Sequence, residues 1–297
     1  MGSEIILILL ALQFALILLG FHIGIVLGLI SGLGVYLIIG NAEAALSIIS
    51  STAYDAVRNQ IFAVIPLFVL MGDIVAKSGA ATDLYRLCDR GLSRLPGRLS
   101  VATVAGNAVF AAVTGVSVAS AATFSRIAYP EMRKYGYDRR FALGSIAGSA
   151  CLGMLIPPSI LLIVWAILTE LSVGALFVAG VVPGLVLTFV FAAYNVIKAS
   201  RNPELAPRIV VDPKNMATPQ QLHSERLGGL GIMALIVLVI GGIWGGLFTP
   251  SEAAGVGVIG ALALGLAKGM RGKELMQAIY DAGKTTAPIL FLLITAS

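Results

Sequence analysis

The chain has 297 residues, of which 58% are apolar and 12% are charged, and its mean hydropathy is +0.95. This is more apolar surface than the core of a water-soluble protein could use, so the composition indicates an integral membrane protein. The net charge of +5 does not indicate nucleic-acid binding, because the basic residues lie in short loops between apolar runs.

Apolar runs that reach or approach the length of a membrane helix follow one another along the chain. We expect membrane helices within residues 4–19, 22–39, 60–75, 141–169, 171–197, 227–248 and 253–267, and the start of another from 285. No basic region precedes the first run, so we interpret it as a membrane helix rather than a signal peptide. A polar cytoplasmic linker at 202–226 separates a first membrane half, 1–201, from the start of a second, 227–297.

Residues 99–125 are uncharged, but they are small and rich in hydroxyl groups. If they crossed the membrane, the basic cluster before them would face the opposite side from the three basic clusters after them. If they enter and leave by one face, these clusters share the cytoplasmic side, and the loops with Glu43, Asp55, Glu170 and Glu252 share the other. The positive-inside rule favours the second arrangement. We therefore predict a re-entrant helical hairpin at about 99–125, with the N-terminus outside.

A broken helix is predicted at about 141–169. Pro157 and Pro158 lack amide hydrogens, and Gly153 weakens the helix before them. Re-entrant backbone at membrane depth must be buried in protein or line a cavity, so the hairpin tip is expected to pack against this break. Amphipathic linkers at 81–95 and 131–140 are expected on the cytoplasmic surface.

The two halves show a weak internal similarity. Residues 56–72 and 282–297 share a charged lead-in, a proline and a run of Leu and Phe. On the charge distribution these two spans run in opposite directions, which favours an inverted-topology repeat.

The hydroxyl and carbonyl oxygens of the hairpin tip and the break are hard, neutral donors that suit Na⁺. Neither segment contains a carboxylate, so a Ca²⁺ or transition-metal site is not expected there. The alternative is that Ser and Thr only hold packed helices together, which is the favoured interpretation of any single hydroxyl. The combination of a re-entrant tip with a helix break favours a binding function.

Other polar residues allow two interpretations. Asp73 is a functional candidate inside a span or an acid at a helix end, and Glu252 is a helix cap or, less favoured, part of a gate. The two cysteines, Cys88 and Cys151, indicate neither a disulfide framework nor a metal site. No phosphate-binding loop or Ser/His/Asp arrangement is present, so an enzyme is not expected.

Three motifs carry a resemblance that runs through nearly the whole chain: "GVSVASAATFS" at 115–125, "LIPPS" at 155–159 and "TPSEAA" at 249–254. With them the chain resembles the large membrane subunit of tripartite ATP-independent periplasmic (TRAP) transporters. The resemblance implies a multi-pass protein of the bacterial inner membrane and an elevator-type secondary transporter driven by a Na⁺ gradient. It also implies uptake of organic acids such as C4-dicarboxylates or sialic acids, without a cofactor. The implied partners are a periplasmic substrate-binding protein and a small four-helix membrane subunit.

The resemblance also implies site residues. A sodium site would include residues of the hairpin and the break: Gly115, Ser117, Ser120, Gly153, Met154 and Pro157. Substrate contacts would include Ser117, Ser149 and Pro158. The tip departs from the family pattern, because Val116 stands where a hydroxyl residue is usual. Family members are longer, so the second hairpin and second broken helix are expected beyond Ser297.

Two other functions stay open at this point. One is a stand-alone sodium/dicarboxylate symporter that needs no binding protein. The other is a non-transporting membrane scaffold subunit whose hairpin merely packs.

Overall fold

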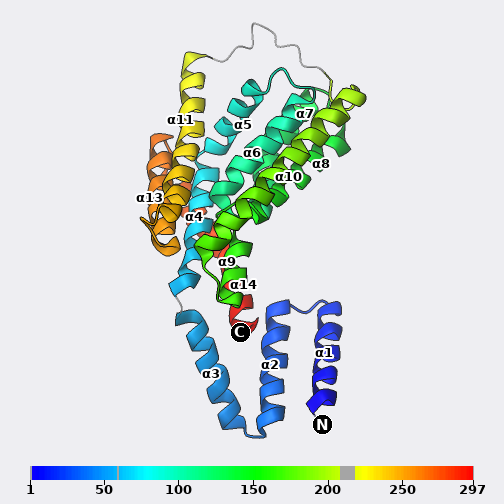
Figure 1. The fold of residues 1–297 in the computed structure, drawn as a ribbon, viewed down its shortest axis with the longest axis vertical. Helices are drawn as coiled ribbons and strands as arrows, with labels where there is room; N and C mark the ends of the chain where they lie inside the picture. Colours follow the sequence, from blue (N-terminus) through cyan, green and yellow to red (C-terminus); the bar gives the residue numbers. More distant parts are fainter. Residues whose placement is uncertain (1, 59, 208–217, 297) are drawn as a thin grey trace. The chain divides into compact units, whose positions relative to one another are not determined.

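The computed structural model describes residues 2–58, 60–207 and 218–296, and within these residues it contains helices and turns but no β-strand (Figure 1). The prediction of an all-α protein is confirmed. The chain divides into two compact units, one of Met1–Ala63 with Gly283–Ser297 and one of Val64–Ala282.

Among the described residues, three helices are long and apolar enough to cross a membrane: Val173–Arg201, Pro219–Trp244 and Pro250–Ala267. A fourth candidate is a bent pair, Ile61–Lys77 with Ala80–Gly91, whose helices are inclined by 68°. Shorter apolar helices cover Glu4–Leu18, Ile23–Ile39, Arg98–Thr114 and Ile160–Thr169. The last two belong to the predicted hairpin and the predicted broken helix, whose parts need not reach across a bilayer on their own.

The first unit contains α1 (Gly2–Leu18), α2 (Ile23–Ile39), α3 (Ala42–Arg58) and the last part of α14 (Gly272–Ala296). Glycines of α2 make room for α14. A Cβ atom at Gly24 would lie 2.7 Å from the ring of Phe291, and one at Gly28 would lie 3.2 Å from Thr295. Small residues at such positions let helix backbones approach closely in membranes.

The prediction of a loop around Glu43 and Asp55 is wrong, because both residues lie in helix α3. Asn41 caps this helix, and its Oδ1 accepts the N–H of Glu43 at 2.9 Å. Apolar residues recur along α3 among polar ones in the pattern of an amphipathic helix. Such a segment is too polar to register as a membrane span, which is why a loop was expected there.

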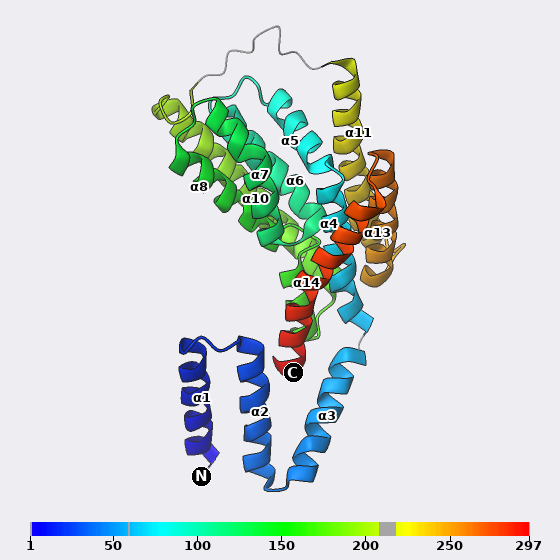
Figure 2. The same ribbon diagram turned by 180° about the vertical axis from the view of Figure 1, so that it is seen from behind.

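The second unit begins with α4 (Val64–Lys77), α5 (Ala80–Gly91), α6 (Arg98–Thr114), α7 (Ser117–Lys134), α8 (Arg139–Ala150), a 3₁₀ turn (Cys151–Met154), α9 (Ile160–Thr169) and α10 (Val173–Arg201). In both views α6, α7, α8 and α10 lie side by side (Figures 1 and 2). The linker expected at 131–140 is shorter, because residues 131–134 continue α7. Helix α8 begins at Arg139 and is capped by Asp138, whose Oδ1 accepts the N–H of Phe141 at 2.9 Å.

The rest of this unit is α11 (Pro219–Ile236), a π-helical turn (Val237–Gly241), α12 (Gly242–Trp244), α13 (Pro250–Ala267) and the first part of α14. The polar linker expected at 202–226 ends earlier, because Thr218 and Gln221 form a capping box that starts α11. Residues 208–217 of this linker lie outside the described residues. Thr249 and Glu252 form the same box at α13, with bonds of 2.8 and 3.3 Å between side chain and backbone, so the interpretation of Glu252 as a cap is confirmed.

Helix α5 differs from the surface helix that its amphipathic sequence suggests. Its Asp83, Leu84 and Tyr85 are buried. Lys268, at the end of α13, donates to the carboxylate of Asp83 and, at 2.6 Å, to the hydroxyl of Ser224 in α11. A second ion pair joins α5 to α11, because Arg90 donates to the carboxylate of Glu225 at 2.9 Å. Part of the polar face of α5, at Asp83, therefore packs against protein, whereas Arg86 and Arg90 stay exposed.

The buried pair of Asp83 and Lys268 gives a first test of this fold. The two side chains are only 8% and 10% exposed. We expect Asp83→Asn to lower the free energy of unfolding by about 3–5 kcal/mol, because the ammonium group would stay buried without its counter-ion. Thermal unfolding of the purified protein in detergent measures this loss.

Two further variants complete that test. Replacing both partners, Asp83→Leu with Lys268→Met, should recover most of the lost stability. Lys273→Met removes a charge from an exposed position and should change stability little. Additive effects of the two single substitutions at 83 and 268 would contradict the pairing.

Candidate functional site

Helices α6 and α7 form an antiparallel pair that turns at Gly115 and Val116, inside the predicted hairpin. Gly115 ends α6 with a φ of +61°, a conformation that glycine adopts without steric cost, and its N–H donates to the carbonyl of Ala111 at 3.0 Å. Within the bundle, Phe124 of α7 packs edge-on against Phe110 of α6, with ring centroids 5.8 Å apart. The two arms are thus held together by aromatic packing below the turn.

The base of α6 is fixed by charge. Arg98 begins this helix and donates to the carboxylate of Asp89 in α5 at 2.9 Å. Nearby, the hydroxyl of Tyr137 accepts the N–H of Leu99 at 3.4 Å, which satisfies an amide at the start of the helix. Whether the pair α6–α7 enters and leaves the membrane on one face stays a prediction.

The break of the second helix covers residues 151–159, between α8 and α9. It consists of the 3₁₀ turn and a non-helical stretch in which the Pro157–Pro158 peptide is cis. The hydroxyl of Ser159 donates to the carbonyl of Met154 at 2.7 Å and so closes the stretch on itself. Two glycines of α10 accommodate it. A Cβ atom at Gly180 would lie 2.6 Å from the carbonyl oxygen of Leu155, and one at Gly184 would lie 2.8 Å from Ile156.

The tip and the break contact each other directly. The N–H of Ile160, at the start of α9, donates to the carbonyl of Gly115 at 3.2 Å. A Cβ atom at Gly115 would lie 2.2 Å from the carbonyl oxygen of Pro158, and one at Gly153 would lie 3.1 Å from the amide nitrogen of Ser117. The prediction that the tip packs against the break is confirmed. We call residues 115–117 with 153–160 the tip–break junction.

Helix ends of both polarities meet at the junction. Helices α7 and α9 both start there, and neither has a side-chain cap. Their N-terminal amides make it favourable for a negative charge. Helix α6 and the 3₁₀ turn end there, and carbonyl oxygens at such ends attract a cation. The junction therefore suits an anionic group and a small cation in close proximity.

The structure brings some of the expected site residues together and leaves others apart. Gly115, Ser117, Gly153 and Pro158 lie at the contact between tip and break. Ser120 is fully buried one turn further along α7, with its hydroxyl 3.4 Å from that of Thr114.

Met154, Pro157 and Ser149 are oriented differently. Met154 offers its carbonyl to Ser159, and its side chain is exposed. The ring of Pro157 lies toward Gly180 of α10, 3.6 Å from the position of a Cβ there. The hydroxyl of Ser149 accepts from the amide of Asn107 at 2.7 Å, so in this structure it pairs with α6.

A row of buried polar side chains crosses α6, α8 and α10, and of its members only Ser149 has a role predicted from the sequence. The row runs from Asn107 in α6 through Ser149 and Ser145 in α8 to Asn195 in α10. Ser145 donates to Asn195 Oδ1 at 2.6 Å, and Ser149 donates to the backbone carbonyl of Ser145 at 2.6 Å. Asn107 and Asn195 could have been found by their occurrence inside otherwise apolar runs, where polar side chains bind neighbouring helices.

One polar atom of the Asn107 side chain takes no part in this row of hydrogen bonds. Its Oδ1 is buried and has no hydrogen-bond partner among the described residues. Asp73 of α4 also has a buried oxygen, Oδ2, for which the described residues supply no hydrogen bond. The neighbouring Gly72 packs on the tip, because a Cβ there would lie 2.8 Å from the Cα of Thr114. A role of Asp73 itself stays a prediction.

Gly115→Ala tests the geometry of the tip. We expect a loss of stability larger than the roughly 1–2 kcal/mol that a left-handed conformation costs an L-residue, because the added methyl group also meets the carbonyl of Pro158. Gly79→Ala is the matched control, since Gly79 has a φ of +80° but no heavy atom within 4 Å of its Cβ position. Thermal unfolding midpoints in detergent compare the two variants. Equal shifts would contradict the contact between Gly115 and Pro158.

Known proteins share this sequence over most of its length. Residues 10–297 match the family described as tripartite ATP-independent periplasmic transporter, DctM component. The chain is 35% identical over 236 residues to the C4-dicarboxylate TRAP transporter large permease protein DctM of Pseudomonas aeruginosa, covering 78% of the chain and 53% of that protein. It is 30% identical over 289 residues to the ectoine TRAP transporter large permease protein TeaC of Halomonas elongata, covering 97% and 66%.

A third relative is the isethionate TRAP transporter permease protein DctMQ of Oleidesulfovibrio alaskensis, to which the chain is 28% identical over 262 residues, covering 88% of the chain and 40% of that protein. The chain spans 53% of the Pseudomonas relative and 66% of the Halomonas one, so it corresponds to part of their length. With its apolar helices and its match to the family over residues 10–297, the chain belongs to the DctM family of TRAP transporter large permeases and is a multi-pass membrane protein.

Proposed function

We propose that this chain forms the first hairpin and first broken helix of a Na⁺-driven permease that imports small organic acids across the bacterial inner membrane. The observation that carries the proposal is the tip–break junction, where two uncapped helix N-termini meet helix ends rich in carbonyl groups. Broken helices with this arrangement hold anionic substrates and coupling cations in secondary transporters.

We infer the class of substrate from the N-terminal amides of α7 and α9, which favour a negatively charged group at the junction. The three relatives described above are named for C4-dicarboxylates, ectoine and isethionate. Every one of these compounds carries a carboxylate or a sulfonate, although their remaining groups differ. We infer that the N-terminal amides of α7 and α9 receive such a group, with Ser117 and Pro158 beside it. The proposal also includes Ser149 as a substrate contact; in the structure its hydroxyl accepts from the amide of Asn107.

A cation at the junction would be coordinated by neutral oxygen atoms of hydroxyl and carbonyl groups. We propose a Na⁺ site built from Gly115, Ser117, Ser120, Gly153, Met154 and Pro157. The carbonyl oxygens of Gly115 and Met154 each accept one hydrogen bond, which leaves each a second lone pair for a cation. Val116 supplies no hydroxyl, so backbone oxygens and the neighbouring serines carry the coordination.

The proposal includes partners and a mode of movement. A periplasmic binding protein would deliver the substrate, and a small four-helix membrane subunit would assemble with the permease, as in the TRAP family. An elevator-type movement and an inverted second repeat are part of the proposal. A stand-alone symporter that needs no binding protein is the second candidate.

Transport in liposomes tests the function. The natural full-length permease, reconstituted with its small subunit, should accumulate an organic acid only with an inward Na⁺ gradient and added binding protein. Uptake that is indifferent to the binding protein would support the stand-alone symporter. Uptake that is indifferent to Na⁺ would contradict the proposed coupling, and a complete lack of uptake for any organic anion would favour the scaffold.

Ser117→Ala and Ser120→Ala test the cation site in the same liposomes. We expect the Na⁺ concentration for half-maximal uptake to rise roughly tenfold, because a hydrogen-bonding group that acts on a charge contributes about 1.5–3 kcal/mol. Ser200→Ala is the control, since its exposed hydroxyl lies at the end of α10 and bonds only to its own helix. An unchanged Na⁺ dependence in both tip variants would remove these serines from the site.

Single cysteines at Ser93 and Lys134 test the re-entrant hairpin. Both positions are exposed and flank the α6–α7 pair. In a background with Cys88 and Cys151 replaced, both should react with a membrane-impermeant thiol reagent from the cytoplasmic side. Labelling from opposite sides would show that residues 99–125 cross the membrane, and labelling of both from outside would reverse the orientation.

A further inference from the structure

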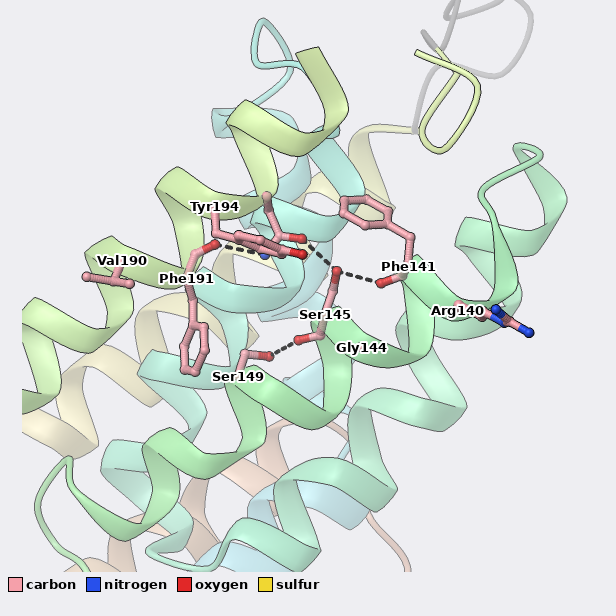
Figure 3. Close-up of a pocket in the computed structure, with 9 residues that line it drawn as sticks. Arg140, Phe141, Gly144, Ser145, Ser149, Val190, Phe191 and Tyr194 are labelled. Carbon is pink, nitrogen blue, oxygen red and sulfur yellow. Dashed lines mark hydrogen bonds between the residues drawn. The ribbon is translucent and has the colours of Figure 1, made fainter. Parts of the chain in front are cut away.

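A groove with a volume of about 400 Å³ lies between α8 and α10 (Figure 3). The residues that line it are Arg140, Phe141, Gly144, Ser145, Ser149, Val190, Phe191, Tyr194 and Asn195. It is distinct from the tip–break junction, of whose residues none lines it. Its outer rim is exposed, because Arg140, Gly144, Val190 and Tyr194 are all exposed.

The two helices run in opposite directions along the groove. Ser145 bonds to Asn195, and a Cβ at Gly148, three residues further along α8, would lie 3.6 Å from Phe191, four residues back along α10. The start of α8 is therefore beside the end of α10. Four exposed basic residues gather at this one end: Arg139, Arg140, Lys198 and Arg201. They belong to the clusters that the positive-inside rule assigns to the cytoplasmic side.

The length of the groove fits one leaflet of a bilayer. From Arg140 to Ser149, α8 rises by about 13 Å at its usual pitch. Half of a hydrocarbon layer is about 15 Å thick. A lipid whose head group lies at the level of Arg140 would therefore extend its acyl chain along the whole groove.

The walls and the floor suit an acyl chain. Gly144 has no heavy atom within 4 Å of its Cβ position, which leaves a slot beside α8. Val190 and Tyr194 form the opposite wall, and α10 beyond them exposes the apolar side chains Val182, Leu185, Val186 and Phe189. In the floor, Ser145 and Asn195 bond to each other and to backbone carbonyls, so an apolar chain would cover them without breaking a hydrogen bond.

We propose that this groove binds one anionic phospholipid of the inner leaflet. The phosphate lies at the basic end, next to Arg140, and one acyl chain runs along Gly144 toward Ser149. The excess of positive charge at this end selects an anionic over a zwitterionic head group, because basic pockets between membrane helices attract anionic lipids. Of the two acids at this end, Asp138 is engaged in capping α8 through the N–H of Phe141 and Glu204 is exposed, so the four basic residues outnumber them.

Native mass spectrometry of the natural full-length permease tests the proposal. The protein is reconstituted in nanodiscs with equal amounts of phosphatidylglycerol and phosphatidylcholine, extracted in mild detergent, and the retained lipids are counted. We expect one phosphatidylglycerol to be retained in preference. Arg140→Gln should reduce this preference roughly fivefold, the effect of one basic residue near the head-group layer. Arg271→Gln is the matched control, because it removes the same charge from an exposed position that belongs neither to the groove nor to its basic end.

A second variant tests the slot itself. Gly144→Leu fills the space beside α8 and should abolish retention of the lipid, whereas Gly255→Leu places the same side chain at an open position on α13 and should not. Thermal unfolding checks that both variants fold. Excess inorganic phosphate should leave the retained lipid in place, since an acyl chain as well as a phosphate holds it.

Three results would overturn the proposal. They are equal retention of both lipids, equal effects of the two arginine substitutions, and lipid retention that survives Gly144→Leu. A groove covered by another protein segment in the full-length permease would give no retained lipid in the unaltered protein and would overturn it too. Because the readout is lipid binding, failure of Na⁺-driven uptake leaves this test unaffected.

Discussion

Buried backbone groups must find hydrogen-bond partners within the protein, and the bond from Ile160 to Gly115 supplies them at the point where α6 ends and α9 begins. The hairpin turn has a carbonyl to satisfy, and the second half of the broken helix has an amide. Each element supplies the partner that the other lacks. Gly115 and Gly153 lack side chains because any larger residue would separate the two backbones.

The sequence predicts the elements that depend on local chemistry. The turn between α6 and α7 falls within 99–125, the prolines interrupt the helix between α8 and α9, and Thr249 and Glu252 cap α13 as their spacing suggests. These features follow from the conformational limits of glycine and proline and from the unpaired amides at helix starts.

The features that the sequence does not predict depend on partners far along the chain. The charged residues of helix α5 predict a face exposed to water, but Asp83 on this helix pairs with Lys268, 185 positions further along the chain. In the sequence Asn107 is an isolated polar residue in an apolar run, whereas in the structure it donates to the hydroxyl of Ser149 in α8. The spacing of residues in the sequence predicts the face of a helix on which a side chain lies. It does not predict which other helix packs against that face. In the same way, the resemblance supplies the site residues as a set, whereas the structure shows the hydroxyl of Ser149 bonded to Asn107 and the ring of Pro157 beside Gly180 of α10.

The polar row from Asn107 to Asn195 has a mechanical consequence. It joins the first arm of the hairpin, the first half of the broken helix and α10 through side chains that have few other partners in an apolar surrounding. If one of these helices slid past another, several buried polar groups would lose their hydrogen-bond partners at once, at a cost of about 1–3 kcal/mol for each. A displacement of the hairpin would therefore carry these three helices together as one block, whereas a movement of the tip alone would break the row.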